Sequence, residues 1–118
     1  MNLEKLYQEM GGNMADAVRR LGSIAAVERF LRMFAGDDTF AMLQAAMSAG
    51  DVQRAFRAAH TLKGLAANLG LVQLWQAASA LTEALRGSDM QRASALYPET
   101  AAAYREACAA IGDLDTDA

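Results

Sequence analysis

Apolar side chains recur every three or four positions along almost the whole chain, which places them on one face of an α-helix. Most of the stretches begin at an Asn, Ser or Asp, which can cap a helix, and several end at a Gly, which can stop one. The stretches are 2–10, 13–21, 24–34, 37–49, 51–69, 71–85 and 89–111. The pattern therefore predicts an all-α protein.

The connections between the long stretches are short, so consecutive helices should be antiparallel neighbours. We predict an antiparallel four-helix bundle with the two short N-terminal helices capping one end. The Gly36-Asp37-Asp38 step leaves open whether residues 37–49 form a helix separate from 23–35 or continue one bent helix. At Pro98, which lacks an amide donor and clashes with the preceding turn, we expect a kink or a break.

Residues 1–112 are expected to form a single domain, followed by a frayed acidic tail at 113–118. The apolar face of the first long helix comprises Ile24, Val27, Phe30, Leu31 and Phe34. Four further residues at helical spacing are expected to fill the core. They are Trp75, Met33, Met42 and Met47. Cys108 is expected to be a small packed hydrophobe.

Composition narrows the function classes. Apolar residues make up 53% of the 118 residues, which is enough for a hydrophobic core that needs no disulfide or metal to stabilise it. No apolar run approaches the roughly 20 residues of a membrane span. A single cysteine and no leader at Met1 favour the cytoplasm. A net charge of −3 argues against general nucleic-acid binding, and one histidine cannot supply a metal or haem site.

The only histidine, His60, stands near the middle of the stretch 51–69. On a helix, the apolar stripe of this stretch comprises Val52, Ala55, Ala58, Ala59, Leu62, Leu65, Ala66 and Leu69. His60 lies outside that stripe, so we expect it exposed on the flank of the bundle. Residues three, four and seven positions away share its face. They are Gln53, Phe56, Arg57, Lys63, Gly64 and Ala67.

Two of these neighbours are informative. Gly64 should cost its helix about 1 kcal/mol relative to alanine, but it clears space through which another molecule could approach the imidazole. Lys63 is within reach of an anion bound to that ring, and Arg57 stands at a similar distance on the other side. Lys63 could also be an ordinary solvated lysine, and Gly64 could serve tight helix packing.

An exposed imidazole between cations suits the acceptance of a phosphoryl group. A ring nitrogen attacks phosphorus while the cations stabilise the phosphoryl oxygens. No Asp or Glu occupies the helical neighbours of His60, so no local carboxylate orients the ring as in a hydrolytic triad. This absence favours a phosphate acceptor over a general base.

The segment His60-Thr61-Leu62-Lys63-Gly64, followed by Ala66-Ala67-Asn68-Leu69-Gly70, resembles the phosphorylation motif of histidine-containing phosphotransfer (HPt) domains. The likeness covers most of residues 23–105. It implies a four-helix bundle whose His60 is phosphorylated from the aspartyl phosphate of a receiver domain and can pass the group on. It also implies that Lys63 assists the phosphoryl group and that Gly64 leaves room for the receiver. Leu65 stands where the family often has a small residue, which concerns packing and not the active face.

Gln53, Phe56, Arg57 and Ala67 are the residues we expect at the rim of a docking surface, because a receiver must bury a patch around the histidine to exclude water. Phe56 could equally complete the core. Asn68 is either a polar residue near the helix end or a phosphate contact.

The sequence thus predicts a phosphocarrier in a multistep His-Asp phosphorelay of two-component signalling, with response-regulator receiver domains or a hybrid histidine kinase as partners. It shows no nucleotide-binding motif, so it should not be a kinase. We expect it to bind no cofactor or metal itself, with Mg²⁺ held by the partner receiver, and to be a monomer. The alternative is a helical docking module that never carries phosphate. A phosphatase would need an amide or acid placed beside His60, and Gln53 and Asn68 are not well placed for that role.

Overall fold

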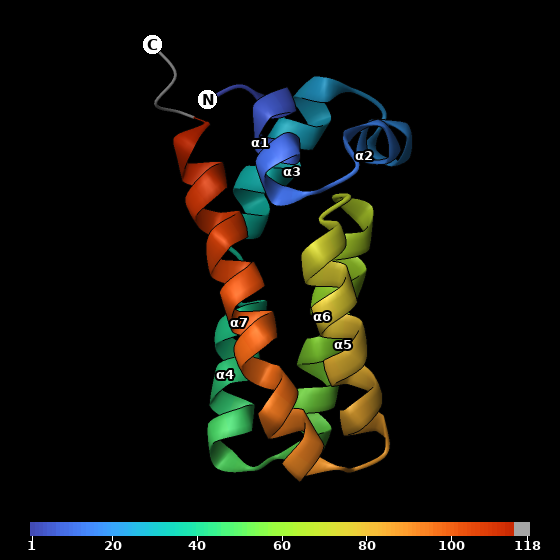
Figure 1. Cartoon of the computed structure of the whole chain (residues 1–118), viewed down its shortest axis with the longest axis vertical. Coiled ribbons are helices and arrows are strands. Elements are labelled where there is room, and N and C mark those ends of the chain that lie inside the picture. Colours follow the sequence, from blue (N-terminus) through green and yellow to red (C-terminus); the bar gives the residue numbers. More distant parts are fainter. Residues whose placement is uncertain (115–118) are drawn as a thin grey trace.

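The computed structural model describes residues 1–114, and within them every regular element is a helix. The helices are α1 (Leu3–Met10), α2 (Met14–Leu21), α3 (Ile24–Ala35), α4 (Thr39–Ala49), α5 (Val52–Asn68), α6 (Val72–Arg86) and α7 (Met90–Asp113) (Figure 1). The all-α class is therefore confirmed. The helix boundaries agree with the capping pattern: five helices begin at a side chain that accepts a hydrogen bond from the amide three residues on. These side chains belong to Asn2, Asn13, Ser23, Asp51 and Asp89.

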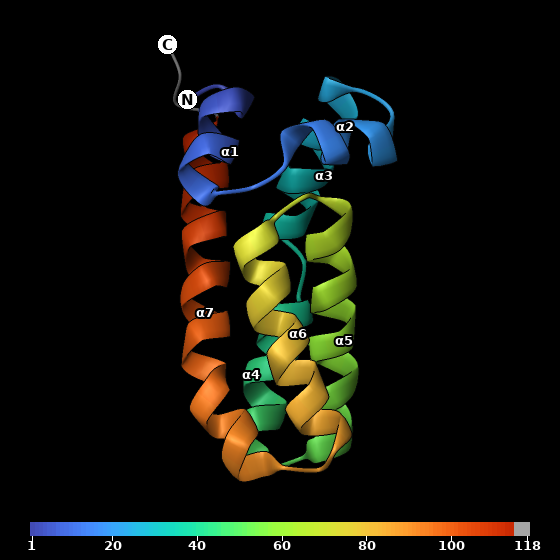
Figure 2. The same ribbon diagram turned by 45° about the vertical axis from the view of Figure 1, so that its right-hand side comes forward.

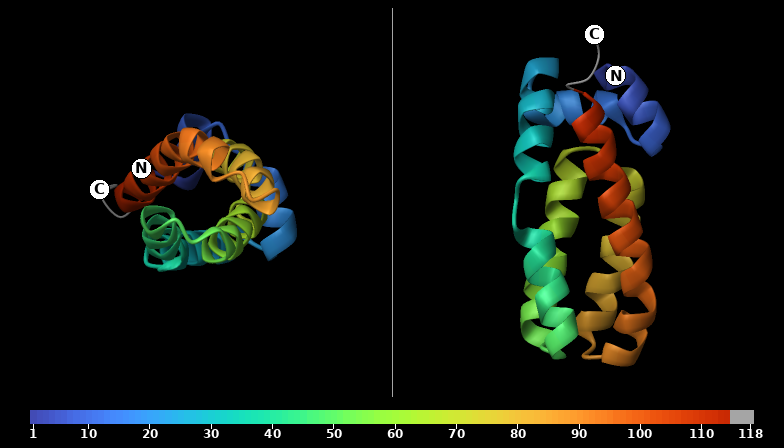
Figure 3. Two further views of the ribbon diagram at one scale, coloured as in Figure 1. Left: turned by 90° about the horizontal axis from the view of Figure 1, so that it is seen from below. Right: turned by 90° about the vertical axis from the view of Figure 1, so that its left-hand side faces the viewer.

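The helices α4, α5, α6 and α7 run side by side along the long axis of the molecule, and α1 and α2 lie across one end of them (Figure 2). Residues 36–38 separate α3 from α4, which settles the question left open by the sequence. The Asp37 carboxylate accepts a hydrogen bond from the Thr39 amide at 2.7 Å and so starts a new helix. Figure 3 shows α3 continuing the line of α4 beyond this step.

Aromatic side chains close the bundle between α4 and α7. The Phe40 ring stacks on Tyr104 with 4.2 Å between centroids, and Phe34 of α3 meets the edge of the same tyrosine at 5.6 Å. Cys108 is half-buried one turn further along α7, where burial raises the pKa of its thiol. The thiol is therefore protonated at neutral pH, as expected of a packing residue.

Helix α7 passes through Pro98 without a break, so of the two expectations, a kink or a break, the break is wrong. Pro98 is exposed, so water can bind the carbonyl that loses its helical partner. Asp113 is the last residue of α7, so the helix extends one residue past the expected domain boundary. Leu114 follows as the C-cap of α7, and residues 115–118 of the predicted tail lie outside the described residues.

Several residues assigned to the core are exposed, namely Ile24, Phe30, Met33, Met42 and Trp75. Ile24 and Trp75 stand in the first turns of their helices. Helix α3 packs only at one end of the bundle, so the apolar stripe of α3 is wider than the part of the bundle that this helix covers. Met47 is half-buried against the core. The core is built mainly from leucines and alanines of the bundle helices.

The N-terminal helices are tied directly to the end of α5. The Tyr7 hydroxyl donates a hydrogen bond to the Leu69 carbonyl at 2.6 Å, and the Asn13 amide donates to the Gly70 carbonyl at 2.9 Å. Gly70 has a φ of 64°, and a Cβ atom on it would collide with the Asn13 carbonyl. Glycine is therefore required at the turn between α5 and α6.

Candidate functional site

His60 lies at the centre of the 17-residue α5, with its side chain exposed. The opposite face of α5 is held in the core by fully buried residues, among them Ala55, Ala59 and Leu62. The backbone of α5 therefore fixes His60 on the flank of the bundle, away from both helix ends. This is the placement that the apolar stripe predicted.

The imidazole of His60 is in contact with one aromatic neighbour. Its ring stacks on that of Phe56, one turn earlier on α5, with 5.9 Å between centroids and 16° between planes. Among residues 1–114 the ring has no hydrogen bond and no ion pair within the chain. Both ring nitrogens are consequently free to react with another molecule.

Gly64 lies one turn beyond His60 and is exposed. A Cβ atom built at this position would meet no atom within 4 Å, so packing inside the chain does not require glycine there. Lys63 is half-buried beside it. In the described part of the chain, neither Lys63 nor Arg57 takes part in an ion pair, so both charges are available to an incoming anion.

Three of the expected rim residues are brought together by α5 and α6. Gln53, Phe56 and Arg57 line a cavity of about 430 Å³ at the start of α5, whose other lining residues include Leu85, Arg86 and Ser88 at the end of α6. Ala67 lies apart from them, in a cavity of about 270 Å³ near the turn between α5 and α6. Trp75 and Arg20 also line that second cavity.

Arg86 also belongs to this site, although it is not among the rim residues predicted from the sequence. Its guanidinium carbon lies 5.0 Å from the centre of the Phe56 ring, and its Nε is 3.3 Å from a carboxylate oxygen of Glu83. The sequence indicates its position indirectly, because two antiparallel neighbouring helices place the end of α6, where Arg86 lies, beside the start of α5. It could have been found by pairing the residues of these two helix ends.

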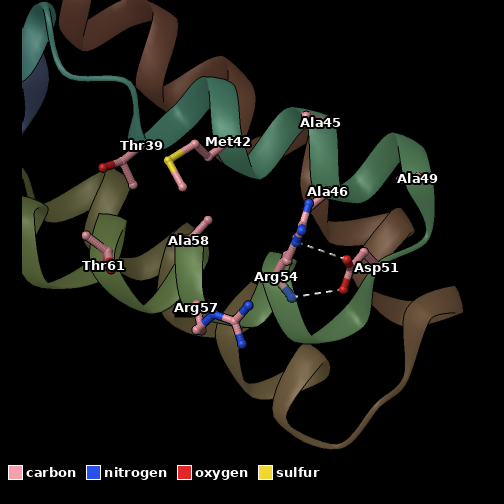
Figure 4. Close-up of a pocket in the computed structure, with 10 residues that line it drawn as sticks. All are labelled: Thr39, Met42, Ala45, Ala46, Ala49, Asp51, Arg54, Arg57, Ala58 and Thr61. Carbon is pink, nitrogen blue, oxygen red and sulfur yellow. Dashed lines mark hydrogen bonds and ion pairs between the residues drawn. The ribbon is translucent and has the colours of Figure 1, made fainter.

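A larger cavity, of about 690 Å³, is lined by residues of α4 and α5 on the other side of the histidine helix (Figure 4). Arg57 and Thr61 line it from α5, and Met42 lines it from α4. Arg54 lies at its edge, with its Nε 3.5 Å from the Asp51 carboxylate. None of His60, Lys63 and Gly64 lines this cavity, so it flanks the reactive face without containing it.

Charge is distributed unevenly around the site. Helix α5 carries Arg54, Arg57 and Lys63 and contains no acidic residue, although the whole chain has a net charge of −3. Asn68 is exposed in the last turn of α5.

Within the described residues, no three His, Cys, Asp or Glu side chains cluster closely enough to hold a metal ion. The helices in that part of the chain are also too short or too polar to cross a membrane.

The chain matches a known protein family. The family model described as Hpt domain covers residues 26–113, which contain α4 to α7 and nearly all of α3 and leave out α1 and α2. No curated protein and no solved structure matches the chain.

Proposed function

The chain belongs to the Hpt domain family, and from this membership we propose that it is a phosphocarrier that accepts a phosphoryl group on His60 from the aspartate of a receiver domain and passes it to another. Membership implies a part in His-Asp phosphorelay signalling, in which Hpt domains carry phosphate and are not kinases. One observation carries the assignment to this residue. His60 is exposed at the centre of α5, its ring nitrogens are free, and the next turn holds a glycine with open space around it.

The proposed chemistry is a reversible exchange of one bond for another. An unprotonated ring nitrogen of His60 attacks the phosphorus of the aspartyl phosphate, so that an N–P bond forms as the P–O bond to the receiver carboxylate breaks. The released carboxylate stays on the receiver, which also holds Mg²⁺ in its acidic site. Lys63 stabilises the phosphoryl oxygens during transfer.

Gly64 has the role of admitting the partner. With no side chain there, the receiver backbone can approach the imidazole and exclude water from the phosphoryl group. Gln53, Phe56, Arg57 and Ala67 form the rim that the receiver contacts. We place this exchange in the cytoplasm, with the carrier acting as a monomer.

The test is transfer of radioactive phosphate from a panel of charged receiver domains to the wild type and to His60→Gln. Label on the wild type that survives alkali but not acid, and that is absent from the variant, is the expected result. Circular dichroism of the variant controls for folding, because an exposed side chain should be replaceable without loss of helix. A receiver that binds without transferring label, or that labels both proteins equally, would leave the docking module as the better description.

A further inference from the structure

We propose that Phe56 and Arg86 form a brace that positions the His60 imidazole for phosphoryl transfer. This role rests on the proposed phosphocarrier function and adds a positioning device to it. The brace consists of two contacts that share the Phe56 ring, one with the guanidinium of Arg86 and one with the imidazole of His60. It joins α6 to the reactive face of α5.

The contact between Phe56 and His60 suits a ring that must react at its edge. The two rings are stacked with their planes within 16° of parallel and 5.9 Å between centroids, and Phe56 makes no hydrogen bond to either imidazole nitrogen. A carboxylate orienting the same ring would occupy a nitrogen, and none is present among the neighbours of His60 on α5. Stacking restricts rotation of an otherwise unpartnered side chain and keeps both nitrogens open.

Arg86 of α6 restrains the Phe56 ring from outside α5, the helix to which Phe56 belongs. Phe56 is half-buried and borders the cavity of about 430 Å³, so its ring has room to turn away. The Arg86 guanidinium lies 5.0 Å from the ring centre and is itself paired with Glu83. A cation over an aromatic face attracts it, and here the attraction holds the ring against α6.

The function of the brace is to limit the orientations of His60 before a receiver arrives. Preorganisation of a reacting group acts on the transfer step itself, so its loss should slow transfer even when every carrier molecule is bound to a receiver. A rim contact would behave differently, because its loss weakens binding and leaves the bound complex equally fast.

The experiment compares wild type with Phe56→Leu, Phe56→Tyr and Arg86→Met. The ring of Phe56 should shift the imidazole proton resonances of His60 upfield in the NMR spectrum. We expect this shift to be lost in Phe56→Leu and kept in Phe56→Tyr. Transfer from a saturating charged receiver should be about threefold to tenfold slower in Phe56→Leu, the factor that corresponds to the strength of one aromatic pair. Because Phe56 is also a rim residue, its replacement by Leu should weaken receiver binding as well, so the rates are compared at receiver concentrations that saturate each variant. Phe56→Tyr should restore the rate.

Two further variants separate the brace from general packing. Arg86→Met combined with Phe56→Leu should be no slower than Phe56→Leu alone, because both changes remove one device. Phe30→Leu is the matched control. Phe30 is exposed, whereas Phe56 is half-buried, but Phe30 likewise carries a guanidinium over its ring, that of Arg29 at 5.4 Å, and it stands on α3. The Phe30→Leu variant should accept the phosphoryl group at the wild-type rate.

The outcomes distinguish the brace from the carrier function. An unchanged His60 resonance in Phe56→Leu, an unchanged transfer rate at saturation, or a loss confined to receiver affinity would each overturn the brace. A wild type that never takes up label refutes the carrier function and with it this role. A labelled wild type with an equally fast Phe56→Leu refutes the brace alone.

Discussion

Gly64 shows how a single residue can be unfavourable for its own helix and still be useful. Alanine at an exposed helix interior is more stable than glycine by about 1 kcal/mol. A methyl group at this position would meet nothing in the chain, so the protein gains no packing by omitting it. This open space supports the proposed role of Gly64 in leaving room for a partner.

This reading predicts opposite effects of Gly64→Ala on stability and on transfer. The free energy of unfolding should rise by up to about 1 kcal/mol, measured by urea denaturation. Transfer from a charged receiver should become slower, because the new methyl group lies in the path of the receiver backbone. Gly112→Ala is the control, since Gly112 is also helical, exposed and unobstructed but stands near the end of α7. Faster or unchanged transfer in Gly64→Ala would show that the glycine does not serve the partner.

At the scale of elements, the N-terminal helices hold the end of the histidine helix through Tyr7. Burial raises the pKa of the Tyr7 hydroxyl from 10.0 to about 12. The folded pKa lies above the unfolded one, so the unfolded chain loses its proton first. The contribution of Tyr7 to stability is therefore complete below about pH 10 and falls as the pH rises toward 12.

Tyr7→Phe should lower the free energy of unfolding by about 1 kcal/mol at neutral pH, because the Leu69 carbonyl loses the hydroxyl donor. The decline of stability between pH 10 and 12 should become shallower than in the wild type. Some decline should remain, because burial also raises the pKa of Tyr104 to about 12. Urea denaturation across this pH range measures both effects, and equal alkaline slopes for the two proteins would contradict the assignment.

The elements also show what the sequence could and could not predict. Helix boundaries were predictable because capping is local: Asp51 and Asp89 bond amides three residues away. The exposure of His60 followed from the apolar stripe of its own helix. The exposure of Trp75 depends on which helix lies opposite, and no periodicity within one helix contains that information. The position of Arg86 required a further step, the pairing of the antiparallel ends of α5 and α6. The break expected at Pro98 is absent because Pro98 is exposed, so water can bind the carbonyl that loses its helical partner.

At the scale of the whole molecule, the chain is acidic but its reactive helix is basic. Arg57 and Lys63 flank His60 on α5. Arg54 is paired with Asp51 at the start of that helix, and the other acidic residues stand outside α5. A local patch of one sign can steer a partner of opposite sign even when the net charge is unfavourable. The acidic phosphorylation site of a receiver is such a partner.

The association rate of a receiver should therefore fall as salt is added, by roughly tenfold between low and high ionic strength. Arg57→Gln should lower the rate at low salt and weaken its salt dependence, because Arg57 is exposed on α5 and has no ion pair among the described residues. Arg92→Gln is the control with the same change of net charge, since Arg92 is exposed in the first turn of α7. Stopped-flow measurements at several salt concentrations distinguish the two cases. Equal effects of the two substitutions would mean that net charge, and not the basic face of α5, governs the encounter.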